Sequence, residues 1–324
     1  MAPLLEIKDL TTSFTQSQKQ ITVVDRVNIA LEAGETVGVV GESGCGKSVT
    51  SLSVMRLLGK NARIDGQVRF DDLDLLTLTE RQMQQVRGNK LAMIFQEPMT
   101  SLNPLHTVGK QISEPLIKHL KLSKREAKNR AIQLLKEVGI PRPEEIYAEF
   151  PHQLSGGMRQ RVMIAIAMAC QPKVIIADEP TTALDVTIQA QILELMKRLK
   201  QQHGTAIMLI THDLGVVAEM CERVIVMYAG QIVEEADVRT LFRAPKHPYT
   251  IGLINSMPEV TSDRERLESI PGTVPSLHEM PEGCRFAPRC SQAMEICRTQ
   301  APDLLSVAET QRCRCWLYAE EGRS

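Results

Sequence analysis

The sequence has 324 residues, of which 43% are hydrophobic and 24% charged, as in a folded globular chain with a large core. This composition excludes a disordered or fibrous protein. Lys and Arg number 38 against 39 Asp and Glu, so the formal net charge of −1 provides no broad basic surface, and we expect no nucleic-acid partner.

Signals for membrane spanning and export are missing from this sequence. Its longest uncharged runs have 12 residues, such as 98–109, whereas an apolar helix needs about 20 residues to cross a bilayer. The first nine residues, MAPLLEIKD, carry acidic side chains where a secretory signal would be apolar. We therefore expect a cytoplasmic chain that cannot span a membrane by itself.

A short apolar strand at 37–40 leads into GESGCGKS at 41–48 and then into a helix-compatible segment at 49–58. This is the phosphate-loop pattern in its strand–loop–helix context. The glycines let consecutive amides turn inward, toward a polyphosphate that the start of the helix also attracts. We expect Lys47 to contact the β- and γ-phosphates, Ser48 to bind Mg²⁺, and Cys45 to contribute its backbone amide. The expected nucleotide contacts in the loop are Ser43, Gly44, Cys45, Gly46, Lys47, Ser48 and Val49.

A second apolar strand, at 174–177, ends in Asp178 and Glu179. A carboxylate at the end of such a strand can position Mg²⁺, and the next one can orient or deprotonate an attacking water. An isolated Asp-Glu pair after an apolar run is usually a solvated strand end. Together with a phosphate loop, the pair indicates a nucleotide hydrolysis site.

Between these two strands lies LSGGMRQR at 154–161, and with it the sequence resembles the ATP-binding subunits of ABC transporters along nearly the whole chain. The stretch is similar to the signature motif of that family, although Met158 replaces the commonest residue, Gln. Ser155 is suited to cap a helix that continues through 162–168, and the backbone amides that follow it in the first turn have no partner within the helix. The resemblance implies that Ser155, Gly156 and Gly157 face a phosphate of ATP held by the other subunit.

The same resemblance implies roles for five further positions. Phe14 is similar to the aromatic residue that stacks on adenine, with a core phenylalanine as the alternative. Gln96 matches the glutamine that reaches Mg²⁺ and the attacking water, and Glu179 matches the general base. Asp185 resembles the aspartate that links two nucleotide sites, and His212 resembles the switch histidine at the γ-phosphate, with a structural histidine as the alternative.

The implied mechanism is a head-to-tail dimer that closes around two ATP molecules and opens after hydrolysis. FQEPMTSLNP at 95–104 and RAPKHPYT at 243–250 resemble the importer ATPases for dipeptides, oligopeptides and nickel. This subgroup implies a heterodimer with a sister ATP-binding subunit, two transmembrane permease subunits and, indirectly, an external peptide-binding protein. We therefore expect peripheral attachment at the cytoplasmic face of the inner membrane; a homodimer is the alternative.

Five of the eight cysteines lie in the last 41 residues: Cys284, Cys290, Cys297, Cys313 and Cys315. In a reducing compartment such a group indicates metal rather than disulfides. Structural zinc sites commonly use pairs about two to four residues apart, and the spacing here is wider. The pattern resembles the extension that holds an iron–sulfur cluster, [4Fe-4S], in some peptide-importer ATPases. This implies Cys284, Cys290, Cys297 and Cys315 as ligands, with Cys313 spare; zinc or no metal are the alternatives.

The predicted fold is an α/β phosphate-loop NTPase of ABC type with an N-terminal antiparallel β portion, an inserted helical subdomain and a C-terminal cysteine-containing extension. We expect an ATP-binding core at 1–96 and 172–240, a helical signature-motif subdomain at 97–171, and the extension at 241–324. In the helical part, Ala131, Leu134, Leu135 and Val138 repeat at helical spacing until Gly139.

The predicted function is ATP hydrolysis that powers import of dipeptides or oligopeptides. A nickel or other small-solute importer ATPase is one alternative. A soluble, non-transport ABC ATPase is another, but such proteins usually carry two cassettes or a long coiled coil. This sequence contains a single phosphate loop and a single signature motif.

Overall fold

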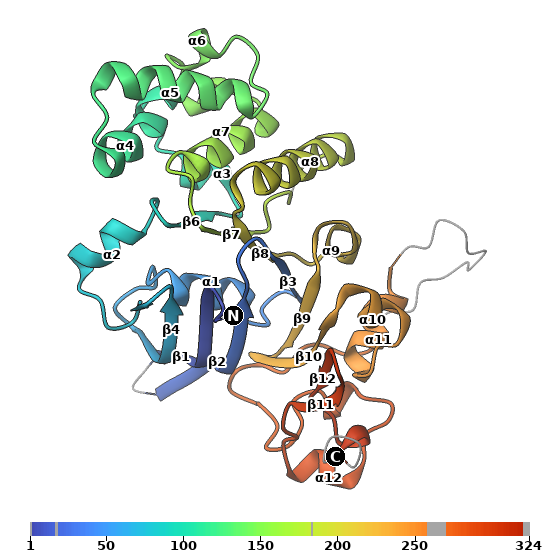
Figure 1. Cartoon of the computed structure of the whole chain (residues 1–324). Coiled ribbons are helices and arrows are strands. Elements are labelled where there is room, and N and C mark those ends of the chain that lie inside the picture. Colours follow the sequence, from blue (N-terminus) through green and yellow to red (C-terminus); the bar gives the residue numbers. More distant parts are fainter. Residues whose placement is uncertain (1, 17–18, 183, 258–269, 320–324) are drawn as a thin grey trace. The chain divides into compact units, whose positions relative to one another are not determined.

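The computed structural model describes residues 2–16, 19–182, 184–257 and 270–319 (Figure 1). The chain divides into two compact units that alternate along the sequence. The first unit comprises 1–4, 31–35 and 77–210, and the second comprises 5–30, 36–76 and 211–324.

The N-terminal part of the second unit is an antiparallel sheet with the strand order β2-β1-β4-β5. Its strands are β1 (Leu5–Gln16), β2 (Lys19–Leu31), β4 (Ala62–Phe70) and β5 (Leu73–Asp74). The pairing of β1 with β4 is interrupted by a bulge that contains Asp9, whose φ is 48°. The extra residue shifts the alternation of side chains between the two faces of the sheet. As a result, Leu5 and Ile7 before the bulge and Leu10 and Thr12 after it are all buried. The predicted antiparallel β portion is confirmed.

The second unit also contains strands in the order β11-β12-β10-β9-β3. They are β3 (Thr36–Val40), β9 (Arg223–Tyr228), β10 (Gln231–Asp237), β11 (Leu305–Ala308) and β12 (Gln311–Cys313). β3 and β9 are parallel, whereas β9, β10, β12 and β11 follow one another antiparallel. The strand β12, from the end of the chain, therefore extends the same sheet that leads into the phosphate loop.

The helices of the second unit are α1 (Lys47–Val54), α9 (Leu214–Met220), α10 (Val238–Arg243), α11 (Pro248–Asn255) and α12 (Glu295–Thr299), with 3₁₀ turns η2 (Ala287–Arg289) and η3 (Trp316–Tyr318). Three aromatic rings join the C-terminal residues to β9. Tyr228 of β9 lies 4.7 Å from Tyr249 of α11 and 5.2 Å from Phe286, between ring centroids. Because all three are buried, the C-terminal region shares a hydrophobic core with β9.

The first unit contains three parallel strands in the order β8-β7-β6, namely β6 (Leu91–Ile94), β7 (Val174–Asp178) and β8 (Ala206–Ile210). Every residue of these strands is buried, as expected for a parallel sheet covered on both faces. The helices are α2 (Glu80–Val86), α3 (Pro98–Ser101), α4 (Val108–Leu120), α5 (Lys124–Glu137), α6 (Pro143–Ile146), α7 (Gly156–Met168) and α8 (Val186–His203), with the 3₁₀ turn η1 (Pro151–Gln153).

The apolar stripe predicted in the helical insertion is the buried face of α5, which packs with α4 and α7 (Figure 1). Ser123 and Glu126 form a capping box at its start. The helix ends at Glu137, just before Gly139 with φ 75°, as predicted. Among the described residues, no helix is both long and apolar enough to cross a bilayer.

His247, at the start of α11, generates a prediction about acid stability. Its buried ring accepts a hydrogen bond at Nδ1 from the amide of Tyr249 at 3.1 Å and also bonds the backbone of Arg314. Burial lowers the pKa of His247 to about 3, so the ring stays neutral in the folded chain while the unfolded chain binds a proton below about pH 6.5. Stability contributed by this group is therefore present above pH 6.5 and is lost as the pH falls toward 3.

We expect the free energy of unfolding to decrease by about 1.4 kcal/mol per pH unit in this window because of His247. The measurement is urea unfolding between pH 7 and pH 4, followed by the fluorescence of Trp316, the single tryptophan. The variant His247→Gln should lose this part of the pH dependence, whereas the exposed His152→Gln should retain it. Equal pH slopes in wild type and His247→Gln would contradict the prediction.

Candidate nucleotide site

The phosphate loop at 41–48 connects β3 to α1 in the second unit. At Gly41, φ is 151°, and a Cβ atom would lie 2.2 Å from the carbonyl oxygen of Met227 on β9. Only glycine fits against β9 at this point. Gly46 is the N-cap of α1 and provides no side-chain acceptor for the first amides of the helix. A helix start of this kind is suited to bind phosphate.

Lys47 is folded into the loop and only 6% exposed. Its Nζ donates to the carbonyl oxygens of Gly41 at 2.7 Å and Glu42 at 3.0 Å, which fixes the ammonium group inside the loop. Burial raises the pKa of the neighbouring Cys45 thiol, and the charge of Lys47 opposes this only in part. Cys45 is therefore a neutral thiol, and its carbonyl accepts from the amide of Gly230 at 2.9 Å.

Phe14 and His212 also belong to the second unit. Phe14 is half-buried on β1, where Thr12 bonds Ser53 of α1 at 2.8 Å. Because side chains two residues apart share a strand face, Phe14 lies on the face of β1 that meets α1. His212 is exposed and follows Thr211, whose amide donates to Val39 of β3 at 3.2 Å. These contacts place Phe14 beside α1 and His212 beside β3, the two elements that flank the phosphate loop.

The predicted catalytic carboxylates lie in the first unit, at the end of β7. Asp178 is buried, and Glu179 has a left-handed backbone with φ 47°, held by its amide donating to Ile210 at 2.8 Å. Such a conformation in a residue other than glycine is costly and is concentrated at functional sites. Gln96 donates from Nε2 to Glu179 Oε2 at 3.0 Å. The structure therefore brings together two of the residues that the sequence assigns to the attacking water.

Thr182 is a site residue that the sequence analysis missed. Its hydroxyl donates to the same oxygen, Glu179 Oε2, at 2.8 Å, so two donors orient one carboxylate. The amide of Thr182 donates to the carbonyl of Glu179 at 3.2 Å, which closes a tight turn. A hydroxyl three residues after the predicted catalytic carboxylate, in a turn, is the signal that could have identified it.

The signature stretch opens α7, as predicted. The exposed Ser155 caps this helix by accepting from the amide of Met158 at 3.4 Å, and Asp185 caps α8 by accepting from Ile188 at 3.0 Å. A Cβ atom on Gly157 would lie 3.0 Å from Ile188, whereas one on Gly156 would meet open space. The absence of a side chain at Gly157 lets the two helix starts lie close together in the first unit.

The cysteines of the C-terminal region lie in the second unit. Each of the eight cysteines is a free thiol. Cys284 donates from its amide to the carbonyl of Cys297 at 2.8 Å. Burial raises the pKa of Cys284, and the nearby Cys297 and Cys315 raise it further; burial, then Cys315 and Cys297, do the same for Cys290. Four of the five thiols therefore share one neighbourhood.

Cys313 lies against this group, because its thiol in β12 is hydrogen-bonded to Cys315. Its hydrogen bond lowers the pKa of Cys315 to about 7 and, together with burial, raises that of Cys313. Within the described residues, no three His, Cys, Asp or Glu side chains converge to hold a single metal ion. Zinc draws its sulfur ligands to about 2.3 Å from one centre, whereas a four-iron cluster takes each thiolate on a separate iron. Among the described residues, the structure therefore shows no metal site.

The predicted nucleotide residues fall in two groups, one in each unit. The second unit contains Phe14, His212 and the loop residues Ser43, Gly44, Cys45, Gly46, Lys47, Ser48 and Val49. The first unit contains Gln96, Asp178, Glu179, Asp185 and the signature residues Ser155, Gly156 and Gly157.

Comparison with known proteins agrees with these features. Residues 24–182 match the ABC transporter family, and residues 233–297 match the oligopeptide/dipeptide transporter C-terminal region. The chain is 55% identical to the oligopeptide transport ATP-binding protein AppD of Bacillus subtilis, with 99% of each chain covered. It is 50% identical to the dipeptide transport ATP-binding protein DppD of Haemophilus influenzae, with 96% of this chain and 94% of that protein covered.

Among solved structures, the ATP-binding cassette MJ0796 in a dimeric post-hydrolysis state with ADP and Pi has a TM-score of 0.66. It is 31% identical and covers 72% of this chain and 99% of its own. The chain therefore belongs to the ATP-binding proteins of ABC transporters. The predicted ABC-type α/β phosphate-loop fold is confirmed, and ATPase activity is expected of this family.

The contact between Thr182 and Glu179 predicts a kinetic effect. We expect Thr182→Val to lower the kcat for ATP hydrolysis about tenfold, since a hydrogen bond to a charged acceptor contributes about 1.5–3 kcal/mol. Thr182→Ser keeps the hydroxyl and should retain most activity. Thr187→Val, on the exposed start of α8, is the control. A normal kcat in folded Thr182→Val would show that the hydroxyl does not orient the carboxylate.

Proposed function

We propose that this chain is the ATP-hydrolysing subunit of an importer of dipeptides or oligopeptides. The observation that carries the proposal is the occurrence, in one chain, of a phosphate loop and a C-terminal region of the oligopeptide/dipeptide transporter type. The relatives named above, which are peptide transport ATP-binding proteins by name, support the same substrate class along the full chain.

For hydrolysis, we assign the water-activating role to Glu179. Gln96 and Thr182 both donate to Oε2 of this residue and so restrict the direction in which the carboxylate can accept a proton. Lys47 compensates charge on the β- and γ-phosphates, and Phe14 stacks on the adenine. Ser48 and Gln96 offer hard oxygen ligands that would hold Mg²⁺, with Asp178 supporting that site. The ion, when bound, neutralises charge on the phosphates.

The second part of the proposal concerns the dimer. Ser155, Gly156 and Gly157 would bind the γ-phosphate of ATP on a partner subunit, because the exposed start of α7 presents amides to an anion. Asp185 would link the two nucleotide sites, and His212 would sense the γ-phosphate. We assign the partner to a sister ATP-binding subunit, which gives a heterodimer that closes with ATP and opens after hydrolysis.

The remaining partners follow from the transport role. Two permease subunits would span the membrane, and an external peptide-binding protein would deliver the solute. The chain would then attach peripherally at the cytoplasmic face of the inner membrane. These partner and membrane assignments depend on the proposal that the solute is a peptide, and the experiment that tests peptide import also tests them.

The variant Glu179→Gln tests this function, because it removes the proton acceptor but keeps the size and hydrogen-bonding capacity of the side chain. We expect ATP turnover to fall at least about 100-fold while ATP binding is retained, and dipeptide uptake by cells that depend on this chain to stop. The exposed Glu194→Gln on α8 is the matched control. Normal dipeptide uptake together with abolished nickel uptake would overturn the peptide assignment in favour of a metal importer.

We also propose that Cys284, Cys290, Cys297 and Cys315 hold a [4Fe-4S] cluster. The support is the wide cysteine spacing, the shared neighbourhood of the four thiols, and the inclusion of the first three in the transporter-type C-terminal region. Bound there, the cluster would supply a covalent link between segments that have few apolar side chains of their own.

The expected result is that anaerobically purified protein contains iron and inorganic sulfide in equal amounts. Cys284→Ser should lose both, whereas Cys170→Ser, outside the C-terminal group, should retain them. Elemental analysis with a sulfide assay provides the measurement. Colourless protein that contains only zinc, or no metal, would refute the cluster.

A further inference from the structure

The segment between Cys284 and Cys290 contacts the phosphate loop directly. Arg289 makes two parallel ion-pair contacts with Glu42, the second residue of the loop, from Nη1 to Oε2 at 2.6 Å and from Nη2 to Oε1 at 2.9 Å. This paired arrangement is the most directional contact that arginine makes with a carboxylate.

Arg289 is itself held from several sides. Its side chain is 4% exposed, and Nε donates to the carbonyl of Pro271 at 2.8 Å. The guanidinium lies over the rings of Tyr228 and Phe286, at 5.7 and 5.9 Å from the centroids. The bond to Glu42 raises the pKa of Arg289, so the charge persists. Because the Arg289 guanidinium is restrained in this way, its ion pair also fixes the position of the Glu42 carboxylate.

The backbone of Glu42 is held by the same C-terminal region. Its amide donates to the hydroxyl of Tyr249 at 2.8 Å, and Tyr249 is fully buried. The carbonyl of Glu42 accepts from Lys47, the residue expected to bind phosphate. The backbone of this one residue therefore connects Lys47 with α11 through its two neighbouring peptide groups, while its side chain connects to Arg289.

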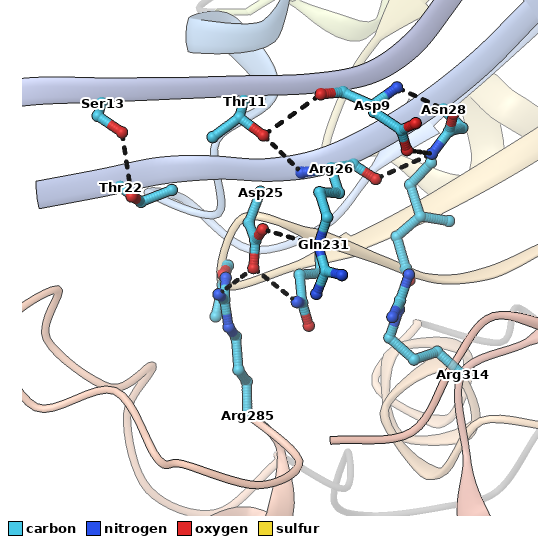
Figure 2. A network of polar contacts seen from close by, with 12 residues as sticks. Asp9, Thr11, Ser13, Thr22, Asp25, Arg26, Asn28, Gln231, Arg285 and Arg314 are labelled. Carbon is cyan, nitrogen blue, oxygen red and sulfur yellow. Dashed lines mark hydrogen bonds and ion pairs between the residues drawn. The ribbon is translucent and has the colours of Figure 1, made fainter. Parts of the chain in front are cut away.

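Arg285 supports the loop from a second direction. It pairs with Asp25 of β2 at 2.5 Å (Figure 2). It also donates to the carbonyl of Ala229 at 2.5 Å. Ala229 and Gly230 form the turn between β9 and β10, and the amide of Gly230 donates to Cys45 of the phosphate loop. Asp25 is further fixed by Gln231, whose Nε2 donates to it at 2.9 Å (Figure 2).

We propose that Arg289, assisted by Arg285, is a positioning residue for the phosphate loop, so that nucleotide affinity depends on the segment that carries Cys284 and Cys290. A loop that binds phosphate through its amides has few internal hydrogen bonds to hold its conformation, so contacts from outside the loop contribute to its shape. The proposal depends on nucleotide binding by this family and not on which solute is transported.

The test is calorimetric titration of the full chain with ADP and Mg²⁺, which requires no hydrolysis. We expect Arg289→Ala to weaken ADP binding about tenfold, by removing two charge-assisted hydrogen bonds. Arg298→Ala, an exposed arginine in α12 of the same region, should bind ADP normally. In steady-state ATPase assays the KM for ATP should rise while kcat stays within about twofold, as expected for lost ground-state binding.

A variant of the other partner in this ion pair, Glu42, distinguishes loss of the contact from a folding defect caused by Arg289→Ala. Glu42→Gln should also weaken ADP binding, and the double variant should be no weaker than the worse single variant, because both remove the same contact. Arg289→Lys keeps the charge but not the paired geometry and should be intermediate. Normal ADP affinity in either folded Arg289→Ala or Glu42→Gln would overturn the proposal. Loss of peptide uptake is a separate readout, so the two proposals fail independently.

Discussion

The shape of the phosphate loop is the constraint on which the rest of the second unit depends. A loop that offers most of its amides to phosphate has few left to stabilise itself, so contacts from its surroundings hold its shape. β9 contacts it at Gly41, the β9–β10 turn bonds Cys45, and Tyr249 and Arg289 hold Glu42. The elements after β10 therefore belong to the nucleotide-binding machinery as well as to the C-terminal region.

Attachment of that region rests on a buried carboxylate. Glu234 of β10 is fully buried, and a buried charge is tolerated only when it is well hydrogen-bonded. Its two oxygens accept from the amides of Lys246 and His247 and from the side chain of Gln311, each at 2.8 Å. One group thus joins β10, the start of α11 and β12. The cysteine-bearing segment is carried on this scaffold, and within it Arg285 follows Cys284 directly and Arg289 directly precedes Cys290.

In the first unit, the comparable constraint is the backbone at Glu179. Its left-handed conformation places the carboxylate where Gln96 and Thr182 both reach Oε2. Gln96 follows β6 and Glu179 follows β7, which are parallel neighbours, so their ends meet at one edge of the sheet. Strand order alone therefore brings two residues 83 positions apart into contact.

The sequence by itself determined the features that depend on a few neighbouring residues. The glycine spacing and lysine of 41–48, the cap at Ser155, the end of α5 before Gly139 and the all-apolar parallel strands are such features, because local backbone geometry and hydrophobic period fix them. The tertiary structure decided the contact between Arg289 and Glu42, 247 residues apart, and it showed that the cysteines share a neighbourhood without converging on one ion. Such contacts depend on how whole elements pack, which no local pattern in the chain encodes.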